Sequence, residues 1–218
     1  MVKNLGLDLD VLHILKNSSN SLEIELSLII IGNLIFDDQN IDNLINGDIL
    51  TVLSKHMLHQ LPEIRRISIW CVTNIAAGRI DHINALLHSG IINQIFYCIN
   101  DTNCHVVYEV FNTFYNILID SDVQMCEQLV NMGLLKVVVH IFTTIESQVV
   151  LSKALKILKK VFSHGETIQQ NNGYQVNPYV HKFTILGGDD RLEKLQYLDS
   201  QDIYDLSVEI LDKYFQVI

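Results

Sequence analysis

The sequence predicts an all-α protein made of repeated helical units. Apolar residues recur at helical spacing, for example at Ile64, Ile67, Cys71 and Ile75. The 218 residues include two prolines and ten glycines, which is too few for a sandwich or barrel with many tight turns. Two residue types also recur at one long period. Together these observations favour a stack of helices.

The period is set by glycines and asparagines. Gly47, Gly90 and Gly133 are 43 residues apart, and Asn33, Asn74 and Asn116 follow one another at 41 and 42 residues. Helical repeats of about 40–47 residues are armadillo or HEAT units. We therefore expect an armadillo-repeat right-handed superhelix, an α-solenoid of about four repeats.

Each unit is predicted to contain three helices. The first is short and precedes the glycine, which turns a sharp corner without a Cβ penalty: Gln39–Asn46, Asp81–Ser89 and Val123–Met132. The second follows the glycine: Asp48–His59, Ile91–Ile99 and Leu134–Phe142. The third is the longest and contains the asparagine: Ser21–Phe36, Pro62–Ala77 and Cys104–Ile119. Because the first helix is too short to be stable alone, the units must stack.

We expect residues 1–218 to form one continuous domain. Residues 1–20 are predicted to be a partial repeat with a helix over Asp8–Lys16, followed by repeats at 21–60, 61–102 and 103–145. The C-terminal part, 146–218, begins with a helix over Ser147–Phe162 and a polar loop over 164–176. A helix starting at Pro178 and helices over Asp190–Leu198 and Gln201–Phe215 follow. The apolar N-terminal face indicates either a longer parent protein or a partner at that end.

Composition narrows the possible partners. The net charge is −10, which repels nucleic acid and anionic lipid and attracts basic partners, although such a charge also simply favours solubility. The cysteines have no paired spacing, and Cys71, Cys98 and Cys126 lie in apolar runs, as expected for buried thiols in a reducing compartment. No signal peptide is predicted, and the apolar run at Leu28–Ile31 is too short to span a membrane.

Trp70 and Asn74 are four residues apart, so they share one helix face. The phrase from Ile69 to Arg79, with Trp-x-x-x-Asn and a glycine at 78, resembles an armadillo repeat of the importin α family. The C-terminal part resembles the last repeat of that family, through Asn177-Pro178-Tyr179, Gly187-Gly188-x-Asp190-Arg191-Leu192 and Ile210-Leu211-Asp212-Lys213-Tyr214-Phe215. By this resemblance the chain corresponds to the C-terminal half of the importin α array.

The resemblance implies a nuclear import adapter that shuttles between cytoplasm and nucleus. In that family a ladder of tryptophans and asparagines lines a concave groove and holds a basic nuclear localisation signal, and the C-terminal half contains the smaller signal site. A carboxamide can donate to and accept from a peptide backbone at once, and an indole face attracts a lysine side chain. The importin β binding segment is absent from this sequence, whereas the C-terminal repeats, which in the family meet the recycling exportin and a nucleoporin, are present.

Matched to the family pattern, Trp70 and Asn74 form a complete rung of the ladder, with Thr73 at a small hydroxyl position. Asn33 matches the asparagine of the preceding rung, with Ile29 where the family usually has arginine. Asn116 matches the next asparagine, but Asn112 occupies its tryptophan position. Glu109 matches an acid that pairs with a cargo lysine, and the equivalent residue before Trp70 is Ile67.

Other interpretations remain open. Trp70 could be a core residue, Asn33 and Asn116 could bridge neighbouring repeats, and Glu109 could be solvated. The lysines at 153, 156, 159 and 160 indicate a solvated face or a site for an acidic partner. No catalytic pattern, cofactor motif or metal ligand set is recognisable, since His56 with His59 and Cys104 with His105 provide too few ligands for zinc. The alternative function is an interaction scaffold that has lost cargo binding. The chain could also be one fragment of a split parent.

Overall fold

The computed structural model describes residues 6–215. Within these residues every regular element is a helix, which confirms the all-α prediction. The helices divide into two compact units, Met1–Ile117 and Leu118–Ile218. The expectations that concern residues 1–5, including their part of the partial repeat 1–20, and residues 216–218 lie outside the described residues.

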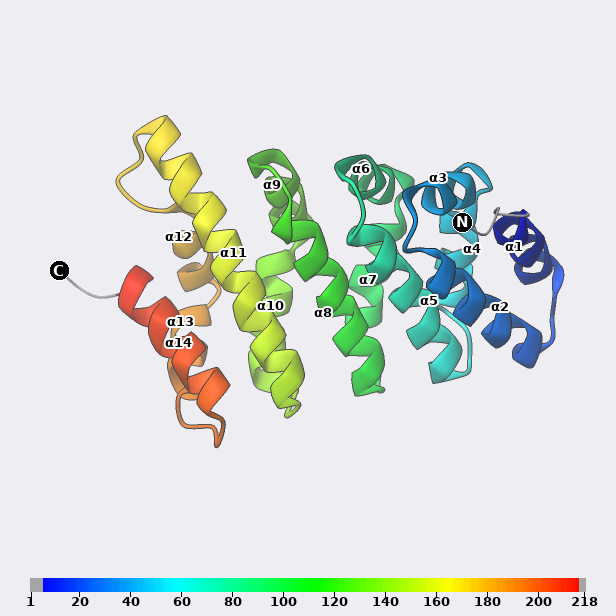
Figure 1. Cartoon of the computed structure of the whole chain (residues 1–218). Coiled ribbons are helices and arrows are strands. Elements are labelled where there is room, and N and C mark those ends of the chain that lie inside the picture. Colours follow the sequence, from blue (N-terminus) through cyan, green and yellow to red (C-terminus); the bar gives the residue numbers. More distant parts are fainter. Residues whose placement is uncertain (1–5, 216–218) are drawn as a thin grey trace. The chain divides into compact units, whose positions relative to one another are not determined.

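In the first unit the long helices α2, α5 and α8 lie side by side, with α4 and α7 behind them and α3 and α6 at their upper ends (Figure 1). Two triplets, α3–α5 and α6–α8, follow the pair α1 and α2 and correspond to the predicted three-helix repeats. The elements are α1 (Leu7–Asn17), α2 (Ser21–Leu34), α3 (Asp38–Asn46), α4 (Ile49–His56), α5 (Pro62–Ala76), α6 (Ile80–Ser89), α7 (Ile91–Tyr97), a 3-10 turn η1 (Cys98–Asn100) and α8 (Cys104–Ile119).

Apolar stripes on successive third helices hold the first unit together. Leu28 and Ile31 of α2 are completely buried, as are Ile64 and Cys71 of α5. The Cys71 thiol also donates to the Leu28 carbonyl over 3.4 Å. The predicted stripe of α5 is therefore a packing surface, and Cys71 behaves as the small buried hydrophobe that was expected.

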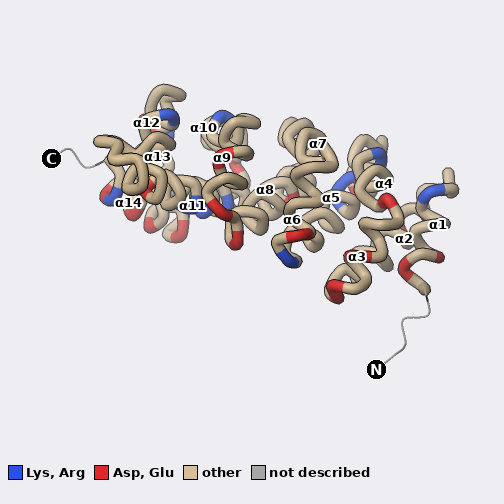
Figure 2. Tube along the Cα trace, turned by 90° about the horizontal axis from the view of Figure 1, so that it is seen from above, with Lys and Arg blue, Asp and Glu red and all other residues tan. Residues whose placement is uncertain are grey.

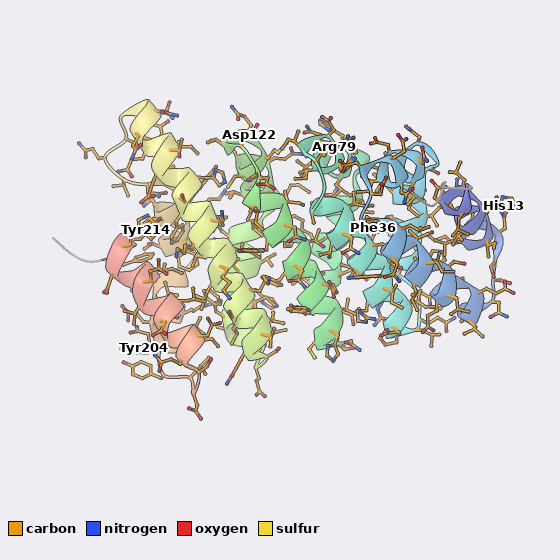
Figure 3. The ribbon with its side chains drawn as sticks, in the orientation of Figure 1. His13, Phe36, Arg79, Asp122, Tyr204 and Tyr214 are labelled. Atoms are coloured by element: carbon orange, nitrogen blue, oxygen red, sulfur yellow. The ribbon has the colours of Figure 1, made fainter. Side chains whose placement is uncertain are left out.

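The second unit contains two further triplets. Its helices are α9 (Val123–Met132), α10 (Leu134–Thr144), α11 (Gln148–Asn172), α12 (Pro178–Ile185), α13 (Gly188–Leu195) and α14 (Gln201–Tyr214). Phe162 on α11 is the centre of an aromatic cluster, with ring centroids 5.4 Å from Phe183 and 5.0 Å from Tyr214. Tyr214 and Tyr204 lie at opposite ends of α14, which packs beside α11 (Figures 1 and 3).

The predicted glycine corners occur at Gly90 and Gly133, whose φ angles of 82° and 113° favour glycine. At the corresponding α3–α4 corner the prediction is wrong in detail, because Gly47 has a negative φ and Asp48 adopts the left-handed conformation instead, with φ 68°. Gly47 is needed there for space, since a Cβ would lie 2.7 Å from Cδ2 of Leu12 on α1. The helix α4 consequently starts at Ile49, one residue later than predicted.

The predicted loop over 164–176 is also wrong, because α11 continues to Asn172 and ends where Gly173 takes φ 67°. Gly165 lies inside the helix, where its missing side chain leaves room for the amide of Asn177. The Asn177 Nδ2 donates to the Phe162 carbonyl over 2.8 Å. Gly165 thus permits a close tertiary contact and does not end the helix.

Acidic segments are visible on α3 and α6 of the first unit and on α14 of the second (Figure 2). Among the described residues, no single helix is long and apolar enough to cross a membrane; the bent pair α9 and α10 could do so by length and composition alone.

Candidate functional site

The predicted site residues lie on the third helices of the first unit. Equivalent positions, 41 or 42 residues apart, place Ile29 and Asn33 on α2, Trp70 and Asn74 on α5, and Asn112 and Asn116 on α8. We call the side of α2, α5 and α8 that presents these residues the ladder face.

Trp70 is half-buried and leans onto α2. Its indole covers Gly32, so closely that a Cβ at position 32 would overlap the ring. The predicted site residues Trp70, Asn74 and Asn33 line one open hollow of about 510 Å³. The other lining residues are Gly32, Ile35, Phe36, Asp38, Ile41, Ala77 and Gly78.

The ladder asparagines make three different contacts. The Asn74 Nδ2 donates to the Gly32 carbonyl on α2 over 3.1 Å, and the Asn116 Nδ2 donates to the Thr73 carbonyl on α5 over 3.0 Å. The exposed Asn33 donates to the Ile29 carbonyl of its own helix. Asn74 and Asn116 therefore bridge neighbouring repeats. The sequence left this alternative open for Asn33 and Asn116, and it applies to Asn116, whereas the hydrogen bond of Asn33 stays within α2. Each bridging amide retains a carbonyl oxygen that can accept a hydrogen bond.

Thr73 and Glu109 are buried between α5 and α8, with 7% and 8% of their surface exposed. The Thr73 hydroxyl lies 2.8 Å from that of Thr113, and it can donate to the Glu109 carbonyl over 3.2 Å. Asn112 donates to the Glu109 carboxylate over 3.4 Å. In this arrangement Thr73 and Glu109 form part of a helix-to-helix network, so a direct contact of either residue with a peptide stays a prediction.

Charges gather around Arg66, one turn from Trp70 on α5. Arg66 and Glu63 form a two-pronged ion pair, with Nε 2.9 Å from one carboxylate oxygen. This hydrogen bond is the main reason that the pKa of Arg66 is raised and that of Glu63 is lowered. Glu109 and Glu25 also act on the guanidinium. Glu109 is buried, but the two more accessible acids, Glu25 and Glu63, still outnumber the one guanidinium, so this part of the ladder face has an excess of negative charge.

Phe36 was not among the predicted site residues. It follows α2 and is 82% exposed at the rim of the hollow. Figure 3 shows Phe36 and Arg79 on the same side of the first unit, where α2 and α5 end. In the repeat register, Phe36 occupies the position of Ala77 and Ile119 in the two following repeats. Aligning the repeats could therefore have identified Phe36 as a candidate site residue.

Asp38, also at the rim, was missed as well. One of its carboxylate oxygens lies 3.8 Å from the Arg79 guanidinium. Arg79 and the buried His82 also contact Asp42, over 2.9 Å and 3.0 Å. Of these charged residues, Asp38 lines the hollow itself.

Two other groups singled out in the sequence are the lysines of α11 and the candidate metal ligands. Lys156 and Lys159 on α11 lie 3.8 Å from Asp202 and 2.5 Å from Glu209 on α14, so they meet acids of the same unit. Within residues 6–215, no set of three histidine, cysteine, aspartate or glutamate side chains is placed to hold a metal ion.

The comparisons with known proteins agree with this geometry. Residues 177–218 match a family model described as an atypical armadillo repeat. Importin subunit alpha-4 of Arabidopsis thaliana is 24% identical over 156 residues, which cover 70% of this chain and 28% of that protein.

Among solved structures, a computationally designed armadillo repeat protein for modular peptide recognition has a TM-score of 0.79 at 19% identity, with 94% of this chain and 80% of that chain covered. A designed armadillo repeat protein in complex with the peptide (KR)4 has a TM-score of 0.66 at 19% identity, covering 94% and 98%. The chain therefore has the armadillo-repeat fold, as the repeat period predicts.

Proposed function

We propose that this protein is a nuclear import adapter that binds a basic nuclear localisation signal on its ladder face, as the minor-site half of importin α does. The observation that supports this most directly is that Trp70, Asn74 and Asn33 line one open hollow. The similarity to importin subunit alpha-4 and to a designed armadillo protein bound to (KR)4 points to the same class of ligand.

In the proposed complex an extended peptide crosses α2, α5 and α8. Neighbouring helices are about 8–10 Å apart and an extended chain advances about 3.3 Å per residue, so each helix meets about every third peptide residue. A lysine or arginine side chain lies over the Trp70 indole. The carbonyl oxygens of Asn74 and Asn116 accept from peptide N–H groups, while their Nδ2 groups keep the bridges to the neighbouring helices.

The negative charge around Arg66 supports a basic ligand. The three acids that act on Arg66, which are Glu25, Glu63 and Glu109, outnumber its single guanidinium, and the whole chain has a net charge of −10. A cationic peptide is therefore attracted both over a distance and at the site.

The test is isothermal titration calorimetry with a lysine-rich signal peptide. Trp70→Ala removes the indole and should weaken binding about 2- to 30-fold, which corresponds to ~0.5–2 kcal/mol for a cation–π contact. Tyr197→Ala, which changes an exposed aromatic residue of the second unit, is the matched control and should bind like the unchanged protein. Equal affinity of the Trp70→Ala and control variants, with both still folded by circular dichroism, would contradict the proposal.

A second function, a protein-interaction scaffold without cargo binding, is supported by the incomplete ladder. In the first unit, Ile29 and Asn112 occupy the two other positions equivalent to Trp70, so one aromatic shelf remains there. In that case the C-terminal repeats would hold a folded partner, such as a recycling exportin or a nucleoporin. Pull-downs with the basic peptide and with the exportin distinguish the two functions. Shuttling between nucleus and cytoplasm is checked by imaging a fluorescent fusion.

A further inference from the structure

One long side of α2 is apolar and open. Leu22 and Ile29 are seven residues apart, which places them on one face of α2, and Phe36 follows two residues after the end of this helix, at the rim of the hollow. Their exposed fractions are 62%, 36% and 82%. We call these three residues the apolar strip.

The repeat register separates this strip from the other exposed apolar residues of α2. Leu26 and Ile30 correspond to Ile67 and Cys71 of α5, which are only 2% and 0% exposed because α2 covers them. Leu26 and Ile30 therefore lie on the side where one repeat stacks on another. Ile29, by contrast, corresponds to Trp70, which lines the open hollow. The apolar strip thus belongs to the ladder face.

The strip and the charged region lie next to each other. Phe36, at the end of the strip, lines the same hollow as Trp70. On α5, one helix further, Glu63 and Arg66 occupy the positions equivalent to Leu22 and Glu25. The ladder face is therefore apolar at Leu22 and Ile29 of α2 and charged around Arg66, on which Glu63 of α5 and Glu25 of α2 both act.

We propose that the ladder face selects an amphipathic linear motif, in which an aliphatic or aromatic residue lies about three residues from a lysine or arginine. This inference rests on the proposed function and specifies its ligand. The apolar residue packs on Leu22 and Ile29 of α2, and the cationic residue lies on Trp70 beside the acids around Arg66.

The occupant is a basic peptide and not a second copy of this chain. The charge around Arg66 is complementary to a cationic peptide, and the strip is continuous with the hollow that we assign to that peptide. A symmetric contact of two chains through α2 would instead bring Glu23 and Glu25 close to their own equivalents, in two molecules that each have a net charge of −10.

The experiment compares four fluorescent peptides by polarisation. The first has one leucine three residues from one lysine, with a neutral remainder; in the second and third the leucine or the lysine is serine; in the fourth the two are adjacent. We expect replacing the leucine to weaken binding about tenfold, as for burial of one aliphatic side chain. Moving the leucine next to the lysine should cost a similar factor.

The matching protein variants locate the effect. With Leu22→Ser and Ile29→Thr together, the leucine and serine peptides should bind equally, whereas Leu26→Ser, on the stacking side of the same helix, should keep the tenfold preference.

Equal binding of the leucine and serine peptides to the unchanged protein would overturn this inference and leave the proposed function standing. If no peptide with lysine binds, the proposed function itself fails. A change of molar mass by light scattering in the Leu22 and Ile29 variant would also overturn the inference, because the strip would then be an interface between copies.

Discussion

At the scale of single residues, the amide groups of the ladder have two tasks. The spacing of Asn33, Asn74 and Asn116 predicts one shared role, yet the structure gives Asn74 and Asn116 a bond to the neighbouring helix and leaves Asn33 exposed. The sequence could not separate these cases, because the acceptors are backbone carbonyls whose positions depend on how α2, α5 and α8 pack. A ladder asparagine is thus a packing residue that still offers an oxygen to a ligand.

The contact of Trp70 with Gly32 leads to the first prediction. Gly32→Ala would push a methyl group into the indole, so we expect about 1–3 kcal/mol of destabilisation, typical of overpacking. Trp70 is the one tryptophan of the chain, so a red shift of its fluorescence should accompany the change as the ring moves toward solvent. Urea unfolding followed by circular dichroism measures the stability. In a Trp70→Leu background the same substitution should cost less, and an undiminished cost there would contradict the assigned overlap.

His56 leads to a prediction on pH. It is 4% exposed on α4, its Nε2 has no hydrogen-bond partner in the described structure, and burial lowers its pKa from 6.5. As the pH falls below about 6.5, His56 binds a proton in the unfolded chain before it does so in the folded protein. The free energy of unfolding therefore has its full value above this pH and decreases below it. Thermal melts from pH 8 to pH 5 should therefore show a decreasing Tm.

Replacement of His56 by leucine removes this titratable group. The variant should lose less stability than the unchanged protein between pH 8 and pH 5, with the value of each protein at pH 8 as its own reference. The remaining slope is expected from His164, whose pKa is also lowered by burial. An unchanged slope in the His56→Leu variant would show that the buried imidazole is not responsible.

At the scale of elements, the sequence was sufficient where helix signals were local. The limits of α8 and α9 agree with the prediction, since Asp122 caps α9 through its side chain and Gly133 ends it with a left-handed φ. The limits of α11 could not be predicted in this way. Gly165 is a helix breaker in isolation, and the contact that explains it comes from Asn177, a residue beyond the end of the helix.

The contact between α11 and α12 gives a prediction for these two helices. The Asn177 side chain caps α12 by accepting from the backbone N–H groups of Tyr179 and Val180, and it donates to Phe162 of α11. We expect Asn177→Ala to cost about 1–3 kcal/mol, for a lost cap and a lost buried hydrogen bond. Gly165→Ala should also destabilise the protein, because the new methyl group overlaps the Asn177 amide.

The two substitutions should couple. When Asn177 is already alanine, the methyl group at position 165 has room and favours the helix, so the double variant should be more stable than the sum of the two single effects predicts. Additive effects in urea unfolding would instead indicate that the two residues act independently.

At the scale of the whole molecule, the repeat period predicts the fold, and the net charge of the chain affects how a ligand approaches. The fold was predictable because each unit repeats the same stacking problem, and two markers kept one register over three units. The site was predictable in part. The helix face of Trp70 followed from helical spacing, whereas the apolar strip depends on which side of α2 the neighbouring helix covers.

The net charge of −10 gives the last prediction, which concerns the rates of peptide binding. Long-range attraction accelerates the encounter with a basic peptide, while contacts on the ladder face determine how long it stays. Raising the salt concentration from about 0.05 M to about 0.5 M shortens the Debye length from more than 10 Å to about 4 Å, so the association rate should fall several-fold or more. The dissociation rate should change by less, because apolar contacts with the strip are not screened. Stopped-flow measurement of Trp70 fluorescence gives both rates.

An apolar peptide of equal length and no net charge is the control, and its association rate should be nearly independent of salt. If salt acted mainly on dissociation, the acids around Arg66 would have to hold the peptide through direct ion pairs, and the apolar strip would contribute little to the lifetime of the complex.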